Sequence, residues 1–277
     1  MRAYIKRLLQ WLLNGIPVME TYARITILQH ENRLKGKKVL ITGGGRGLGF
    51  NMAKKLIESG AEVVICGRNE DTLKKASSKL KDCPYLVFDV RLFEKYGEFI
   101  AEADKMVGGG LNCLINNAGI SLHEHSFEDV SFEGYDAQFD TNLKSPYFLS
   151  QAFIKYAKEH NITGLNIIFV TSERGLYCDS LPYGLTKAAI NSLTVGLARR
   201  YVNLGVRVNA IAPGVTASDL VKIDTSGNIY RERSCGKRFF LGEEVAEATA
   251  FLLSDESSCV DGEILPCNQG NHYRSDY

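Results

Sequence analysis

A glycine-rich segment, Thr-Gly-Gly-Gly-Arg-Gly-Leu-Gly at positions 42–49, joins an apolar run at 39–42 to a helical pattern at 50–59. Glycines at such a junction permit a tight turn and let the backbone approach a bound pyrophosphate closely. The free amides at the start of the helix then attract its negative charge. In an arbitrary loop this would be a weak signal, but the first strand–helix junction makes it informative. The segment predicts a phosphate-binding turn within an α/β fold.

From residue 36 onward, short apolar runs alternate with longer helical patterns. Strands are expected at 39–42, 62–66, 85–88, 111–115, 166–170, 206–211 and 264–267. Helices are expected at 50–59, 70–81, 93–106, 132–159, 183–201 and 243–253. Strands this apolar, separated by helices, indicate a parallel sheet covered on both faces. We expect one doubly wound, Rossmann-type α/β domain over 34–277, because no linker or internal repeat interrupts the pattern.

Residues 1–33 form an extension before this domain, and residues 1–18 are basic at first and then amphipathic. One helical stripe would contain Ile5, Leu8, Leu9, Leu12 and Leu13. Such a helix can pack on the domain or on a neighbouring subunit, lie in a membrane surface, or belong to a cleaved signal peptide. No Ala-x-Ala cleavage site follows it. No apolar run reaches the roughly 18 residues that span a bilayer.

Charge and cysteine usage exclude several classes of protein. The net charge of +1 gives no bulk attraction to nucleic acid or to an acidic membrane. The seven cysteines are odd in number and contain no Cys-x-x-Cys pair, which argues against a structural zinc site and a disulfide framework. Scattered thiols suit a reducing compartment, so we expect a cytoplasmic protein, with any membrane contact limited to weak attachment through residues 1–18. His123-Glu124-His125 lacks further ligands, and we expect no metal site.

Further motifs follow the glycine turn in order: Asn116-Asn117-Ala118-Gly119, Asn142, Ser172, Tyr183-x-x-x-Lys187 and Pro213-Gly214. With the Thr-Gly-x-x-x-Gly-x-Gly spacing of the turn, the chain resembles the single-domain branch of the short-chain dehydrogenase/reductase family over about residues 34–270. The resemblance implies a nicotinamide cofactor and hydride transfer to or from a small-molecule carbonyl or alcohol carbon. It also implies a homo-oligomer, a tetramer or dimer, formed through the helices at 132–159 and 183–201.

The end of the second strand indicates which nicotinamide cofactor is used. NAD-binding members of such folds usually carry an acidic residue there, which holds the ribose hydroxyls. Here the strand ends in Gly67 and Arg68, and Arg68 can pair with a 2′-phosphate, as can Arg46 in the turn. We therefore predict NADP(H). By resemblance, the cofactor contacts are Thr42, Gly43, Gly45, Arg46, Gly47, Leu48, Gly49, Arg68, Asp89, Val90, Asn116, Ala118, Gly119, Tyr183, Lys187, Pro213, Gly214 and Thr216.

Tyr183 and Lys187 lie four residues apart on a predicted helix, so their side chains share one face. A tyrosine is a poor base at neutral pH, but an ammonium about 4 Å away would lower its pKa by roughly three units. We therefore expect Tyr183 to act as a general acid/base. Ser172 follows the strand at 166–170, where parallel sheets present functional residues. By resemblance, Ser172 binds the substrate oxygen, Lys187 also holds the nicotinamide ribose, and Asn142 anchors a water for proton relay.

These residues predict an NADP(H)-dependent reductase of ketones or 3-oxoacyl groups, similar to 3-oxoacyl-carrier-protein reductases and hydroxysteroid dehydrogenases. The alternative is a cofactor-sensing or scaffold protein that keeps the fold and has lost turnover. The intact Ser172, Tyr183 and Lys187 argue against it. One feature departs from the family: only ten residues separate Ser172 from Tyr183, about two fewer than expected. The loop begins with Glu173 and Arg174, which can touch substrate or simply be solvated.

Overall fold

The computed structural model describes residues 32–217 and 227–273 of the chain. Within these residues, seven parallel strands form one sheet in the order β3-β2-β1-β4-β5-β6-β7. The strands are β1 Lys38–Thr42, β2 Glu62–Gly67, β3 Tyr85–Val87, β4 Cys113–Asn116, β5 Asn166–Val170, β6 Arg207–Pro213 and β7 Ile264–Cys267. The sheet grows outward from β1 in both directions, so the predicted doubly wound Rossmann-type fold is confirmed.

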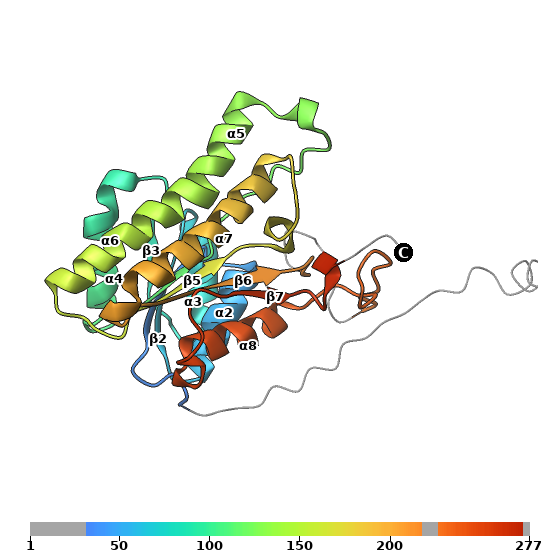
Figure 1. The fold of residues 1–277 in the computed structure, drawn as a ribbon. Helices are drawn as coiled ribbons and strands as arrows, with labels where there is room; N and C mark the ends of the chain where they lie inside the picture. The colour runs from blue at the N-terminus through green and yellow to red at the C-terminus, as the bar shows by residue number, and fades with distance from the viewer. Residues whose placement is uncertain (1–31, 218–226, 274–277) are drawn as a thin grey trace, which may run out of the picture.

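Helices cover both faces of this sheet (Figure 1). One layer contains α2 Gly47–Glu58, α3 Glu70–Lys79 and α8 Gly242–Leu253, and the other contains α4 Tyr96–Met106, α6 Ser145–Glu159 and α7 Pro182–Tyr201. In β1, Val39 and Ile41 pack against the first layer, whereas Leu40 between them packs against the second. Because the central strands β1, β4 and β5 are buried on both faces, their sequences are largely apolar.

The single helix expected over 132–159 is interrupted in the structure. It consists of α5 Phe132–Phe139, a π-helical turn η3 Asp140–Lys144, and α6. Pro146 lies in the first turn of α6 and has no N–H to donate to the carbonyl of Asn142, four residues earlier. The regular hydrogen-bond pattern is therefore broken at this point, and Ser145 donates instead to the carbonyl of Asp140. The interruption places Asn142 in the widened turn.

The helix expected over 1–18 lies outside the described residues, so the division between an extension and a domain stays a prediction. Leu34, the first residue of the expected domain, is fully buried. Among the described residues, no helix is long and apolar enough to cross a membrane. The same residues contain no group of three or more histidine, cysteine, aspartate or glutamate side chains that could hold a metal ion. All seven cysteines are free thiols.

Candidate active site

The predicted site residues lie at the ends of β1 to β6 or in the connections that follow them. Most of them stand at or directly after the carboxyl end of a strand, whereas Asn142 lies in η3 and Tyr183 and Lys187 lie in α7. Parallel strands all end at the same edge of the sheet. β1 pairs with β4 on one side and with β2 on the other, so the connections after β1 and after β4 run in opposite directions along the sheet. The crevice between the loops after β1 and β4 is therefore the switch point at which such sheets bind ligands.

The glycine turn after β1 has the geometry of a phosphate cradle. Gly43 and Gly47 adopt positive φ angles of 67° and 57°, which glycine reaches without steric cost. Gly45 lies in the turn, and Gly47, Leu48 and Gly49 begin α2. The helix has no side-chain cap at its N-terminus and no acidic residue in its first turn. Its first amides therefore remain available to an anion, and the helix dipole favours negative charge there.

Asn117 holds this turn in place from β4. Its side-chain Nδ2 donates to the carbonyls of Thr42, at 2.8 Å, and Gly43, at 3.0 Å. In return, Oγ1 of Thr42 accepts from the backbone amides of Asn117 and Ala118, each at 3.0 Å. A Cβ on Gly49 would collide with the carbonyl of Gly43 and with this amide. The close packing explains why glycine stands there and shows that the residues present fit a dinucleotide pyrophosphate.

Asn117 is a site residue that the sequence reasoning missed, although it belongs to the motif quoted for the resemblance. Its neighbour Asn116 was named as a cofactor contact, and that residue is buried with its amide donating to Ser150 Oγ on α6 at 3.0 Å. The two side chains alternate across the strand end, so Asn116 faces the helix layer and Asn117 faces the turn. The alternation of side chains along a strand could have distinguished the two.

The residues expected near the adenosine end of the cofactor follow β2 and β3. Arg46 and Arg68 are both exposed. Hydrogen bonds from Arg91, 2.7 Å from the Asp89 carboxylate, lower the pKa of Asp89, and the charge of Arg68 adds to this effect. Val90 is buried, and its carbonyl accepts from the Tyr96 hydroxyl at 2.5 Å. The only carboxylate in this group is therefore already occupied by an arginine.

The four residues expected to act in catalysis lie close together. The Ser172 side chain lies close enough to the Tyr183 hydroxyl to lower its pKa, and Nζ of Lys187 lies 5.6 Å from the centre of the Tyr183 ring. Asn142 is held rigidly, because its amide donates to the Ile120 carbonyl and its oxygen accepts from the Ile120 N–H, both at 2.8 Å. A Cβ on Gly119 would lie 3.3 Å from Asn142 Oδ1 and 3.6 Å from Lys187 Nζ. Their catalytic roles stay predictions.

One electrostatic expectation is wrong for the chain's own groups. Lys187 was expected to lower the pKa of Tyr183, yet burial raises it, and only the hydrogen bond from Ser172 and the charge of Arg174 act in the opposite direction. Nζ of Lys187 lies over the Tyr183 ring but donates its hydrogen bond to the Val170 carbonyl, at 2.8 Å. Burial also lowers the pKa of Lys187 to about 8. The cost of dehydrating the phenolate therefore outweighs the charges around it.

The segment after β6 closes the site on its other side. Pro213 ends β6, and the N–H of Gly214 donates to the Cys267 carbonyl of β7 at 3.1 Å. A Cβ on Gly214 would lie 2.6 Å from the Phe240 ring. Thr216 is buried, and its hydroxyl donates to the Gly214 carbonyl at 2.9 Å. The predicted nicotinamide-flanking residues thus form a compact turn against β7.

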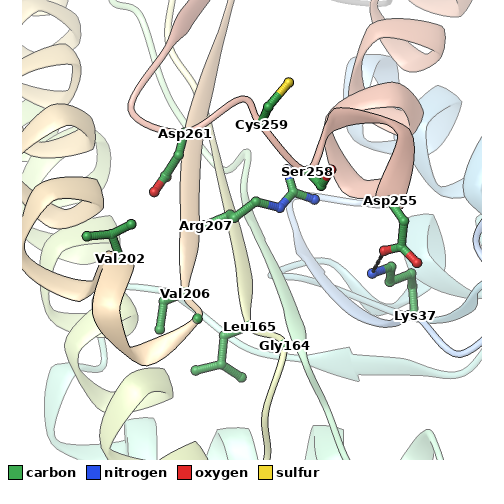
Figure 2. A pocket seen from close by; sticks show the side chains of 11 residues that line it. Lys37, Gly164, Leu165, Val202, Val206, Arg207, Asp255, Ser258, Cys259 and Asp261 are labelled. Carbon is green, nitrogen blue, oxygen red and sulfur yellow. Dashed lines mark hydrogen bonds and ion pairs between the residues drawn. The ribbon is translucent and has the colours of Figure 1, made fainter.

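A cavity of about 460 Å³ lies at the opposite edge of the sheet, among residues that precede β1, β5 and β6 (Figure 2). Its charged groups are already paired. Lys37 forms an ion pair with Asp255 at 2.8 Å, and Arg207 donates to the carbonyls of Ser254 and Ser257. The site residues described above are all at the other edge, so their chemistry and not the size of this cavity identifies the candidate active site.

The match to known proteins agrees with this geometry. A family model described as enoyl-(acyl carrier protein) reductase matches residues 43–272, a span that includes the glycine turn and the Ser172, Tyr183 and Lys187 group. The chain belongs to the short-chain dehydrogenase/reductase family. Members of this family are oxidoreductases that use nicotinamide cofactors, and the cradle between β1 and β4 fits such a group.

Individual relatives of this short-chain dehydrogenase/reductase differ in substrate. A 3alpha-hydroxysteroid dehydrogenase of Mediterraneibacter gnavus is 35% identical over 244 residues, which cover 84% of this chain and 95% of that protein. A gluconate 5-dehydrogenase of Gluconobacter oxydans is 31% identical, with 86% and 95% covered. The solved structure of a 3-ketoacyl-(acyl-carrier-protein) reductase from Brucella melitensis, complexed with NADH, is 27% identical, covers 86% of this chain and 99% of its own, and has a TM-score of 0.78.

Gly49→Ala tests the cradle. Because the added methyl meets the Gly43 carbonyl and Asn117, we expect the turn to shift and nucleotide affinity to fall by roughly tenfold or more, about 1.4 kcal/mol. Fluorescence titration with NADPH measures the affinity. Gly97→Ala is the matched control, since nothing lies within 4 Å of its Cβ on α4. Unchanged NADPH affinity in Gly49→Ala would contradict the assignment of the cradle.

Proposed function

We propose that this chain is an NADP(H)-dependent oxidoreductase that interconverts a ketone or 3-oxoacyl group and a secondary alcohol, with Tyr183 as the general acid/base. The observation that carries the proposal is the proximity of the Tyr183 hydroxyl to Ser172 and Lys187, at the same sheet edge as the phosphate cradle. Support comes from relatives named as dehydrogenases and reductases that act on hydroxyl or keto groups.

The mechanism for reduction follows from the positions of the side chains. Bound NADPH supplies the hydride that reaches the carbonyl carbon. Ser172 donates a hydrogen bond to the carbonyl oxygen, which places that oxygen beside the Tyr183 hydroxyl. Tyr183 then transfers its proton to the oxygen as negative charge develops there, which gives the neutral alcohol. Because burial raises the pKa of Tyr183, the phenol is protonated at neutral pH and ready to act as the acid.

Lys187 and Asn142 would serve the return of the proton. The lysine Nζ is buried at the carboxyl end of β5, and at a pKa of about 8 it is still mostly charged at pH 7. Asn142 is fixed by two hydrogen bonds to Ile120 and lies within 3.4 Å of the Thr186 hydroxyl on α7. The rigid amide and the ammonium therefore line a polar route from Tyr183 toward η3, along which a proton can be replaced.

The preference for NADP(H) rests on the residues after β2. Gly67 provides no carboxylate to hold ribose hydroxyls or to repel a 2′-phosphate, and the exposed Arg68 and Arg46 offer guanidinium groups. Within the described ranges neither arginine side chain forms a hydrogen bond or an ion pair, so both guanidinium groups remain available to a phosphate. The Brucella structure contains NADH, so the fold alone does not determine which cofactor is used. The proposed preference for NADP(H) therefore depends on these two side chains.

A homo-oligomer is the second part of the proposal. The helices α5, α6 and α7 lie on one side of the sheet (Figure 1). Large apolar side chains on these helices are exposed. They are Phe132, Tyr135, Tyr147, Phe148, Leu185 and Val195, each at least 40% exposed. An apolar surface of this kind is typical of a subunit interface.

Tyr183→Phe removes the transferable proton and keeps the ring. We expect kcat to fall by roughly 10²- to 10⁴-fold while NADPH affinity is retained. Absorbance of NADPH is followed with a panel of ketones, 3-oxoacyl thioesters, a sugar acid and an enoyl thioester. Tight NADPH binding without turnover of any substrate by the wild-type chain would favour the scaffold alternative. Turnover of the enoyl thioester alone would also overturn the proposed reaction.

Arg68→Asp reverses the charge that faces the adenosine ribose. We expect preference to move from NADP(H) toward NAD(H) by roughly tenfold to a hundredfold, because a charged hydrogen bond of about 1.5–3 kcal/mol is lost. The ratio of kcat/KM for the two cofactors measures the change. Lys75→Asp makes the same charge change on the exposed face of α3 and should leave the ratio unaltered. A wild-type chain that already prefers NADH would refute the cofactor assignment.

The double variant Tyr147→Glu, Phe148→Glu should dissociate the oligomer, because two carboxylates would be buried without partners at the interface. Light scattering after size exclusion gives the mass of the wild-type chain and of the variant. Met106→Glu, at the end of α4, is a control of similar exposure outside these three helices. A monomeric wild-type chain would rule out this part of the proposal.

A further inference from the structure

The loop between Ser172 and Tyr183 contains a cation placed against the Tyr183 ring. Cζ of Arg174 lies 5.9 Å from the ring centroid, in the 3-10 turn η4 Glu173–Gly175. We propose that Arg174 is a positioning residue that acts through Tyr183, its fixed charge stabilising the phenolate that remains when the proton leaves. This inference rests on the proposed role of Tyr183 as the acid/base. The inference assigns a role in the reaction to Arg174, near the start of the loop between Ser172 and Tyr183.

The guanidinium of Arg174 is held in one orientation by Asp179. Nε donates to Asp179 Oδ2 at 2.6 Å, and Nη2 lies 2.5 Å from the same oxygen. The Asp179 side chain is only 7% exposed, and its other oxygen accepts from the N–H of Leu181 at 3.0 Å, just before α7. A Cβ on Gly184 would collide with this carboxylate. The ion pair is thus packed against the first turn of the helix that carries Tyr183.

The backbone on which Arg174 stands is also fixed. Glu173 is buried, and its Oε2 accepts from the side-chain amides of Asn268, at 3.2 Å, and Asn271, at 2.9 Å. On the other side, the Gly175 carbonyl accepts from Asn191 Nδ2 of α7 at 2.8 Å. The N–H of Arg174 itself donates to Ser172 Oγ at 3.2 Å. The turn therefore joins the C-terminal segment, α7 and the Ser172 side chain, with the guanidinium at its centre.

Arg174 is better suited than Lys187 to this electrostatic task, although both cations lie at a similar distance from the ring. Nζ of Lys187 is directed at the Val170 carbonyl, and burial lowers the pKa of Lys187 to about 8, so its charge is lost in the alkaline range. A guanidinium keeps its charge over the whole range in which enzymes work. The charge of Arg174 and the Ser172 hydrogen bond are the influences that counteract the burial of the Tyr183 phenol.

The charged groups around Tyr183 determine how far removal of Arg174 should shift the ionisation of the phenol. Within the described part of the chain, the cations over its ring are Arg174 from the loop and Lys187 from α7. Arg174 also forms an ion pair with Asp179 and interacts with Tyr177. Burial raises the pKa of Tyr177, and the charge of Glu173 raises it further. Because Asp179 offsets part of the guanidinium charge, removal of Arg174 should move Tyr183 ionisation up by about one pH unit, a tenfold change.

The experiment measures the ionisation of the phenol at position 183 in the absence of substrate. Tyr183 is replaced by 3,5-difluorotyrosine, whose phenol ionises at lower pH than the other tyrosines, and the ultraviolet absorbance of the full chain is titrated against pH. Arg174→Met should raise the pH midpoint of the titration by about one unit. Arg174→Lys keeps a positive charge, so its midpoint should stay close to that of the chain with Arg174. Arg200→Met removes an exposed guanidinium about 25 Å further along α7 and should change nothing. An unmoved midpoint in Arg174→Met would overturn the inference.

A kinetic measurement complements the titration. With the secondary alcohol that the wild-type chain oxidises fastest, Arg174→Met should shift the ascending limb of kcat against pH upward by a similar amount. A variant that raises KM for anionic substrates only, with an unmoved pH profile, would make Arg174 a substrate ligand and refute the proposal. The absorbance titration does not depend on turnover. Failure of this inference is therefore distinguishable from failure of the proposed oxidoreductase function.

Discussion

The candidate active site depends on the connection between the ends of β1 and β4. These strands are adjacent in the sheet but far apart in the chain, as the pairing of Ile41 with Ile115 shows. The exchange of hydrogen bonds between Thr42 and Asn117 fixes the distance between the glycine turn and the loop that contains Gly119. Gly119 in turn packs against Asn142 and Lys187. The phosphate cradle and the catalytic group are thereby positioned relative to one another by backbone contacts.

Around Tyr183, the proposed acid/base, burial and charge act against each other. Removing water from around Tyr183 favours the neutral phenol, which is the form needed to protonate a carbonyl oxygen. Oxidation of an alcohol needs the ionised form, and the positive charge of Arg174 moves the balance toward it. The same side chain can then work in both directions only if these influences stay comparable. Glu173, which fixes the η4 turn, and Asp179, which binds the guanidinium, serve this requirement because they hold Arg174 beside the Tyr183 ring.

Much of this arrangement could be predicted from the sequence, because it depends on local patterns. The strand ends at Thr42, Asn116 and Ser172 follow apolar runs that only a two-sided sheet explains. The side-chain directions at those ends could not be predicted as well. Asn117 rather than Asn116 holds the turn, and Lys187 reaches a backbone carbonyl instead of the phenol. Spacing of four on a helix brings two side chains to one face, but long-range contacts decide where each one points.

The two edges of the sheet show why the anionic cofactor belongs on only one of them. At the carboxyl edge, α2 begins with free amides and a positive dipole end directed at the crevice. The helices end at the opposite edge of the sheet, and the carbonyls of their last turns need hydrogen-bond donors. Arg207 donates hydrogen bonds to the carbonyls of Ser254 and Ser257 after α8, so this guanidinium already has partners within the protein. A cavity at that edge offers paired charges and helix C-termini, which repel phosphate. The direction of the helices therefore determines the location of the site before any catalytic residue is considered.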